Sequence, residues 1–166
     1  MKIDCVTIFP EMFTPMWQSI VGRAQTKGII DFHTVQLRDF AVNAYGQVDD
    51  SPYGGEPGMV IRPEPLARAI RSTGVKEDGG KVIFLTADGE PFTHKIAHEL
   101  SKENHLVLLC GHYKGIDERI RENFVDREIS IGDFVVSGGE LPAMVLTDAV
   151  TRLLPGALGD KGSGET

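Results

Sequence analysis

The chain has 166 residues, of which 41% are hydrophobic and 25% are charged, and its formal net charge is −7. This length and composition predict one soluble domain that buries roughly 70% of the surface its unfolded chain exposes, and no apolar run approaches a membrane helix of roughly 20 residues. The opening MKIDCVTIFPEMF lacks the pattern of a secretory signal, and the acidic charge argues mildly against a nucleic-acid partner because phosphate contacts need Lys and Arg.

Short apolar runs alternate with segments of helical spacing along the whole chain. Strands are predicted at residues 2–8, 30–37, 81–86, 105–110 and 126–131. This alternation predicts an α/β fold with a mostly parallel sheet covered by helices.

Three of the intervening segments predict helices with one buried face. The first carries an apolar stripe, the second opens with Pro63 and Pro65, and the third follows Thr93, a typical N-cap residue. The residues expected in the core are Met12, Phe13, Met16, Trp17 and Ile20, then Leu66, Ala69 and Ile70, and then Ile96, Ala97 and Leu100.

Two regions interrupt the alternation. Residues 38–62 form a Gly- and Pro-rich segment that is too long for a routine connection, which is typical of a functional or disordered loop. Residues 159–166 (GDKGSGET) contain no apolar side chain and resemble the start of a flexible linker.

The commonest nucleotide-binding motifs are absent, since the sequence has neither GxGxxG after the first strand nor GxxxxGK[ST]. Instead, Gly-rich turns follow three predicted strands: TADGE, GHYKGIDER and GDFVVSGGELP. Each alone could be no more than a tight turn. Because ligands of open α/β sheets bind at the carboxyl ends of strands, the three together predict a pocket lined by backbone, suited to an adenine edge.

Several other features have ordinary structural explanations. Cys5 and Cys110 lie in apolar runs without CxxC spacing, so we expect reduced core thiols in a cytoplasm. His94 and His98 stand four apart but lack the Glu of a zinc protease motif, so we expect no metal. Asp117 could cap its helix. Two basic clusters could contact phosphates or be solvated faces: Arg62, Arg68, Arg71 and Lys76, and Arg119, Arg121 and Arg127.

Three motifs stand out: SPYGGEPGM (51–59), CGHYKGIDER (110–119) and IGDFVVSGGELPAM (131–144), the last followed by Arg152 and LLPG. Together they resemble the motifs of the bacterial tRNA (guanine-N1)-methyltransferase family. The resemblance covers nearly the whole chain. It implies a SPOUT-type α/β knot with a deep C-terminal trefoil knot, S-adenosylmethionine as methyl donor, a homodimer, and N1 of guanosine 37 in tRNA as the target. The residues alone predict an unknotted sheet, because true knots are rare.

The resemblance also implies a division of the chain. Residues 1–158 correspond to the knotted cofactor-binding domain and 159–166 to the start of the interdomain linker. A helical tRNA-binding domain follows in the family and is not expected within these residues.

The family motifs imply roles for individual residues. The cofactor pocket would comprise Phe84, Leu85, Thr86, Ala87, Gly111, Tyr113, Gly115, Ile131, Gly132, Asp133, Phe134, Val135, Val136, Gly138, Gly139 and Pro142. The residues near the target guanine would be Arg38, Asp39, Asp50, Tyr53, Gly54, Gly55, Pro57, Gly58 and Met59.

Arg152 matches the family arginine that stabilises charge on guanine O6. The family's general base is an Asp beyond Thr166, and Asp160 lies too early to match it. We therefore expect these residues to bind cofactor but to turn over poorly. Lys114, Glu56 and Ala87 depart from the family pattern, where an acidic residue, Gly and Pro are usual.

Two alternatives remain open at this point. One is another knotted RNA methyltransferase, acting for instance on a ribose hydroxyl, against which the SPYGGEPGM segment argues. The other is a non-catalytic α/β binding domain, which would bind no S-adenosylmethionine.

Overall fold

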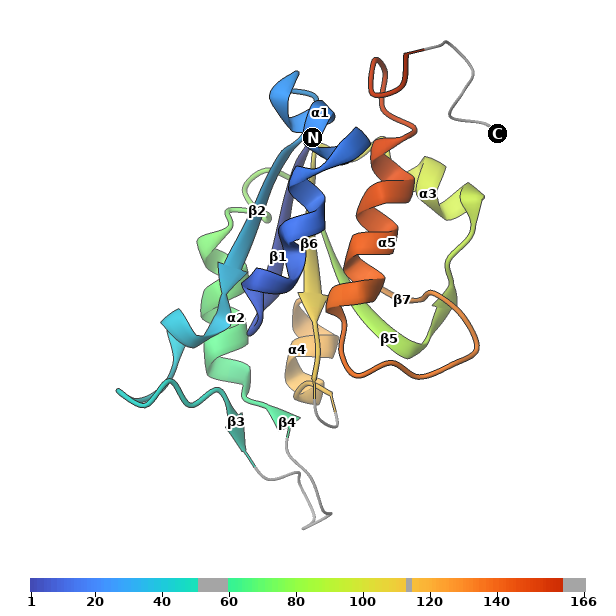
Figure 1. Cartoon of the computed structure of the whole chain (residues 1–166). Helices are drawn as coiled ribbons and strands as arrows, with labels where there is room; N and C mark the ends of the chain where they lie inside the picture. The colour runs from blue at the N-terminus through green and yellow to red at the C-terminus, as the bar shows by residue number, and fades with distance from the viewer. Residues whose placement is uncertain (51–59, 113–114, 160–166) are drawn as a thin grey trace.

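The computed structural model describes residues 1–50, 60–112 and 115–159 (Figure 1). One five-stranded sheet has the order β2-β1-β6-β5-β7, and all of its strand pairs are parallel. The strands are β1 (Lys2–Thr7), β2 (Asp31–Gln36), β5 (Lys81–Pro91), β6 (His105–Cys110) and β7 (Arg127–Ser130).

Helices cover both faces of this sheet (Figure 1). One face carries the 3₁₀ helix η1 (Pro10–Trp17) with α1 (Ser19–Thr26), α3 (His94–Leu100) and α5 (Glu140–Thr151), and the other carries η2 (Leu37–Phe40), α2 (Pro63–Ser72) and α4 (Glu118–Asn123). The predicted parallel α/β fold is confirmed. Within the described residues, no helix has the length and apolar character needed to cross a membrane.

The central strand β6 shows why the sequence folds in this way. All six of its residues are buried, because its side chains point alternately into the two hydrophobic cores. Leu106 and Leu108 pack on the α5 side, whereas Val107 and Leu109 pack on the α2 side. A strand buried on both faces is a continuous apolar run, as HLVLLC is.

Helix starts follow their sequence signals. The Thr93 hydroxyl accepts a hydrogen bond from the amide of Ile96 at 3.2 Å, and the Asp117 carboxylate accepts one from the amide of Arg119 at 2.9 Å. Both predicted caps are confirmed, and each satisfies an amide that a first helical turn leaves unpaired.

The first helix differs from its prediction. The chain forms η1 up to Trp17, breaks, and starts α1 at Ser19, whose φ is +53°. In a 3₁₀ helix residues three apart share a face, so Phe13 and Met16 are buried together. Met12 and Trp17, predicted to lie in the core, are 37% and 49% exposed.

The region of residues 38–62 is partly described. β3 (Asp49–Asp50) and β4 (Val60–Ile61) pair as antiparallel strands, so the two ends of the 51–59 segment lie side by side. The amide of Ile61 donates to the carbonyl of Gly115 at 3.1 Å, and the amide of Asp117 donates to the carbonyl of Ile61 at 3.3 Å. These bonds tie the base of the segment to the turn after β6.

The chain between β7 and α5 runs around the end of β5 before α5 packs back on the sheet (Figure 1). The amide of Gly139 donates to the carbonyl of Gly111 at 2.9 Å, so this connection lies directly against the turn after β6. The arrangement fits the trefoil knot that the family resemblance implies. Of the predicted linker, only Gly159 lies within the described residues.

Candidate functional site

The irregular second half of β5 and the turns after β6 and β7 meet and enclose a pocket of about 330 Å³. The segment TADGE, predicted as a turn after the strand at 81–86, is therefore part of β5. Small-molecule sites in proteins measure roughly 300–1,000 Å³. Its described lining residues are Phe84, Leu85, Thr86, Ala87, Asp88, Gly111, His112, Gly115, Ile129, Ser130, Ile131, Phe134, Val135, Val136, Ser137, Gly138, Gly139 and Pro142.

The first wall comes from a strand that is longer than predicted. β5 continues past residue 86 to Pro91, with a register shift against β7 between Leu85 and Glu90. The residues within this shift project from the ladder, and Ala87 and Asp88 are exposed beside the pocket. Such bulges commonly border functional sites because they redirect side chains out of the sheet.

The second wall is the turn after β6, the third wall is the connection from β7 to α5, and the two are in contact at Gly139. A Cβ at Gly139 would lie 2.7 Å from the Cα of Cys110, so only glycine allows the connection to pass this close to the end of β6. Beyond it, Phe134 and Val135 are 55% and 85% exposed at the pocket rim. The pocket is thus lined mainly by backbone and apolar side chains, an arrangement suited to a flat, largely uncharged ring read through main-chain groups.

A buried polar cluster lies under the pocket. Glu140, the first residue of α5, is 1% exposed, and its carboxylate accepts a hydrogen bond from the hydroxyl of Thr7 at 2.9 Å. His112 Nε2 lies 2.7 Å from both Glu140 oxygens. Sequence reasoning missed both residues, although a histidine in the second turn and an acid opening the GGELP helix were visible signals.

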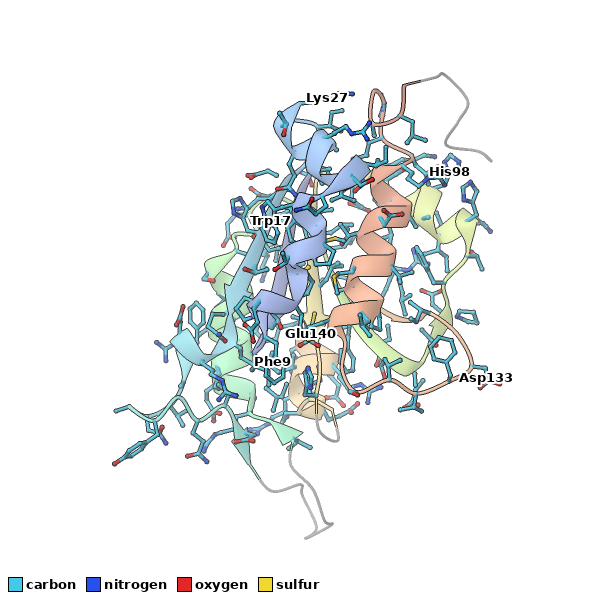
Figure 2. All side chains as sticks on the ribbon, in the orientation of Figure 1. Phe9, Trp17, Lys27, His98, Asp133 and Glu140 are labelled. Carbon is cyan, nitrogen blue, oxygen red and sulfur yellow. The ribbon has the colours of Figure 1, made fainter. Side chains whose placement is uncertain are left out.

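Most of the residues expected at the cofactor line this pocket, but two do not. Gly132 and Asp133 stand outside its wall, and Figure 2 shows Asp133 on the outer bend of the loop. Tyr113 lies outside the described residues, as does Lys114. The lining residues that the sequence did not indicate are Asp88, His112, Ile129, Ser130 and Ser137.

The residues expected at the substrate are only partly described. Arg38 and Asp39 are exposed in η2, where the Arg38 guanidinium donates to the carbonyl of Gly46 at 3.3 Å. Asp50 ends β3. Tyr53, Gly54, Gly55, Pro57, Gly58 and Met59, together with Glu56, lie outside the described residues.

Arg152 is far from the pocket of its own chain. It is the C-cap residue of α5, whereas the pocket lies at the amino end of that helix. At 1.5 Å per residue, Glu140 and Arg152 are separated by about 18 Å along the helix axis. Figure 1 shows the two ends of α5 at opposite ends of the sheet.

The two basic clusters are rearranged in space. Arg68, Arg71 and Arg119 line one hollow between α2 and α4. Arg127 instead pairs with Glu90 at 2.7 Å and with Glu99 at 2.9 Å, which joins β5, α3 and β7.

The metal prediction concerned two histidines. The rings of His94 and His98 lie edge to face with centroids 5.2 Å apart. Within the described part of the chain, no group of three or more His, Cys, Asp or Glu side chains could hold a metal ion.

Comparison with known proteins agrees with this geometry. The model of the family described as tRNA (Guanine-1)-methyltransferase TrmD matches residues 1–166. A tRNA (guanine-N(1)-)-methyltransferase of Dictyoglomus turgidum is 53% identical over 98% of this chain, and one of Brevibacillus brevis is 54% identical over 98%. The chain spans 66% of the length of the first and 67% of the second.

The crystal structure of the tRNA (m1G37) methyltransferase of Aquifex aeolicus has a similar fold. It matches with a TM-score of 0.87 and 42% identity, covering 97% of this chain and 73% of that one. The parallel sheet and the pocket at its carboxyl edge define an α/β protein with a candidate ligand site built from a strand bulge and two Gly-rich turns. Within that class, the chain belongs to the tRNA (guanine-1)-methyltransferase family.

Proposed function

We propose that this protein transfers a methyl group from S-adenosylmethionine to N1 of guanosine 37 in tRNA. The observation that carries the proposal is the meeting of the β5 bulge and two Gly-rich turns in one pocket, whose second wall is hydrogen-bonded to Ile61, shortly after the 51–59 segment. The chain that follows the candidate substrate segment is thereby held beside the pocket. Support for the target comes from the family and from the similar Aquifex aeolicus protein, which is a tRNA (m1G37) methyltransferase.

The residues present fit an adenosine-like cofactor. Gly138 and Gly139 allow the third wall to pass close to His112 and Cys110, where a Cβ would collide, and the pocket is lined mainly by backbone and apolar side chains. The residues that would hold the adenosine part are those of the first and third walls: Phe84, Leu85, Thr86, Ala87, Ile131, Phe134, Val135, Val136, Gly138, Gly139 and Pro142. When bound, S-adenosylmethionine supplies a methyl group that its sulfonium already activates.

The remaining task of the protein is alignment and charge stabilisation. Holding two reactants in line removes most of the entropic cost of a bimolecular step. Methylation of N1 releases its proton to a base, and negative charge develops on O6 as that proton leaves. In the family pattern the base follows residue 166. Arg152 would stabilise the O6 charge with its guanidinium.

We propose a homodimer because Arg152 cannot reach its own pocket. An exposed apolar surface runs along η1 and α5, which lie on the same face of the molecule (Figures 1 and 2). Exposed apolar side chains gathered on one face commonly mark a protein interface. The exposed side chains that form it are Met12, Trp17, Leu141 and Val145. A second copy packed there could bring its Arg152 to the first copy's pocket.

We propose tRNA as the macromolecular partner and the cytoplasm as the compartment. The Arg68, Arg71 and Arg119 hollow offers local positive charge despite the acidic total. Cys5 and Cys110 are both free and buried, which suits a reducing compartment.

Methyl transfer to defined transcripts tests the proposal. A chain carrying the whole length of its relatives is incubated with labelled S-adenosylmethionine and a tRNA transcript, and the same transcript with adenosine at position 37 serves as control. We expect label only on the first transcript, as 1-methylguanosine. Label on a ribose hydroxyl would favour the alternative of another knotted RNA methyltransferase. Absence of both label and cofactor binding would favour the alternative of a non-catalytic α/β binding domain.

A further inference from the structure

The buried Glu140 carboxylate has no part in the proposed methyl transfer, yet it lies where three segments cross. It begins α5, contacts Thr7 at the end of β1, and contacts His112 in the turn after β6. Figure 2 shows it at the start of α5. Burying a carboxylate costs several kcal/mol unless it is paired and hydrogen-bonded, so its partners are essential to its presence there.

Both partners are themselves fixed. The Thr7 hydroxyl also accepts a hydrogen bond from the amide of Phe9 at 2.9 Å. The ring of Phe9 contacts the His112 ring edge to face, with centroids 5.0 Å apart. These contacts link β1, the turn after β6 and α5.

His112 connects this cluster to the pocket. It lines the pocket, and a Cβ at Gly138 would collide with its imidazole. Gly138 is itself a lining residue of the third wall. The position of the His112 ring therefore sets the separation between the second and third walls, and Glu140 sets the position of the ring.

We propose that Glu140 is a positioning residue for the cofactor pocket, acting through His112. The inference rests on the proposed function, because it takes the pocket to be the cofactor site. Loss of the carboxylate would allow the His112 ring to turn toward the pocket and would leave the Thr7 hydroxyl without its acceptor. The first consequence weakens binding, and the second lowers stability alone.

The chain contains a matched control. His105 Nε2 lies 2.6 Å from the Asp4 carboxylate and its Nδ1 lies 2.8 Å from that of Asp78. The His105 and Asp4 side chains are 1% and 5% exposed, and they stand on the same two strands, β6 and β1. Neither residue lines the pocket in the described structure. Asp4→Ala should therefore lower stability without moving a pocket wall.

The experiment measures the dissociation constant of S-adenosylhomocysteine and the free energy of unfolding for wild type, Glu140→Ala, Glu140→Gln and Asp4→Ala. All binding is measured well below each melting temperature. We expect Glu140→Ala to weaken binding at least about tenfold, equivalent to about 1.4 kcal/mol, and Asp4→Ala to leave it unchanged. Glu140→Gln should recover much of the loss, since its amide oxygen can accept from Thr7 and His112.

A second cycle keeps the inference testable if Glu140→Ala does not fold. Glu140→Met keeps the length of the side chain but removes the acceptor. Glu140→Met, His112→Gln and the double variant of the two should each weaken binding to the same extent, because both residues act through one ring. Equal effects of Glu140→Ala and Asp4→Ala on binding, or unchanged binding in a folded Glu140→Ala or Glu140→Met variant, would overturn the inference and leave the proposed function intact. Absence of binding in the wild type would overturn both.

Discussion

The two cysteines, Cys5 in β1 and Cys110 at the end of β6, are buried close to the pocket. Cys110 is the last residue of β6, and its Cα lies against Gly139, where the connection between β7 and α5 passes the end of β6. Burial raises the pKa of the Cys110 thiol, and electrostatic interactions with Cys5 and Glu140 raise it further. Burial is also the main cause of the raised pKa of Cys5. A raised thiol pKa lowers the thiolate fraction, and the thiolate is the reactive form.

Both thiols should therefore be inert in the folded protein. With an aromatic disulfide reagent at pH 8, we expect no fast reaction in native buffer and reaction of both cysteines after unfolding in guanidinium. The measurement is the absorbance of released thiolate against time. Rapid modification of the native protein would show that one of the two strands opens readily, contrary to its full burial.

At the scale of elements, the sequence was most informative where one local signal decides the structure. The run of β6 is one case, because a strand buried on both faces needs apolar residues throughout. The caps Thr93 and Asp117 are another, because an unpaired amide at a helix start needs a side-chain oxygen to accept its hydrogen bond. The family motifs likewise indicated most of the pocket residues, although their binding role stays a prediction.

Features that depend on distant contacts could not be predicted in this way. The extension of β5 beyond residue 86 depends on its register against β7, which only the folded sheet defines. The break at Ser19 similarly replaced an apolar stripe of ordinary helical spacing. The pairing of His112 with Glu140 joins residues 28 positions apart.

The extension of β5 requires glycine at position 89. A Cβ there would lie 2.5 Å from the amide nitrogen of Ile129 and 2.6 Å from the carbonyl carbon of Glu128, both backbone atoms of β7. Gly89→Ala should lower the free energy of unfolding by about 1–3 kcal/mol, the usual cost of overpacking. Chemical denaturation measures this, with Asp88→Ala as the exposed neighbour. Equal stability of the two variants would mean that the β5–β7 register is not constrained as described.

At the scale of the whole molecule, the proposed site requires two copies of the chain. The pocket lies at the amino end of α5 and Arg152 at its carboxyl end, so each proposed site combines the pocket of one copy with the arginine of the other. The exposed Trp17, Leu141 and Val145 provide the apolar contact surface. Isologous dimers pair the same surface patch on both subunits, which suits this exchange.

Subunit mixing tests this arrangement. In chains with the whole length of the relatives, Arg152→Ala should spare cofactor binding and slow methylation about 10²–10³-fold, as loss of a charge-stabilising donor does. Mixed and reassociated with the pocket variant Gly138→Val, it should recover about a quarter of wild-type activity, because half the dimers then contain one intact site. No recovery, despite confirmed mixed dimers, would place Arg152 and its pocket in one subunit.

The central claim, that the β5 bulge and two Gly-rich turns form a cofactor pocket, is tested most directly by calorimetric titration of this chain with S-adenosylhomocysteine. We predict saturable binding at one site per chain, abolished by Gly138→Val, whose added side chain collides with His112, and retained by Gly159→Ala, whose Cβ meets open space. No heat of binding with the folded wild-type chain, or equal binding by Gly138→Val, would contradict the account.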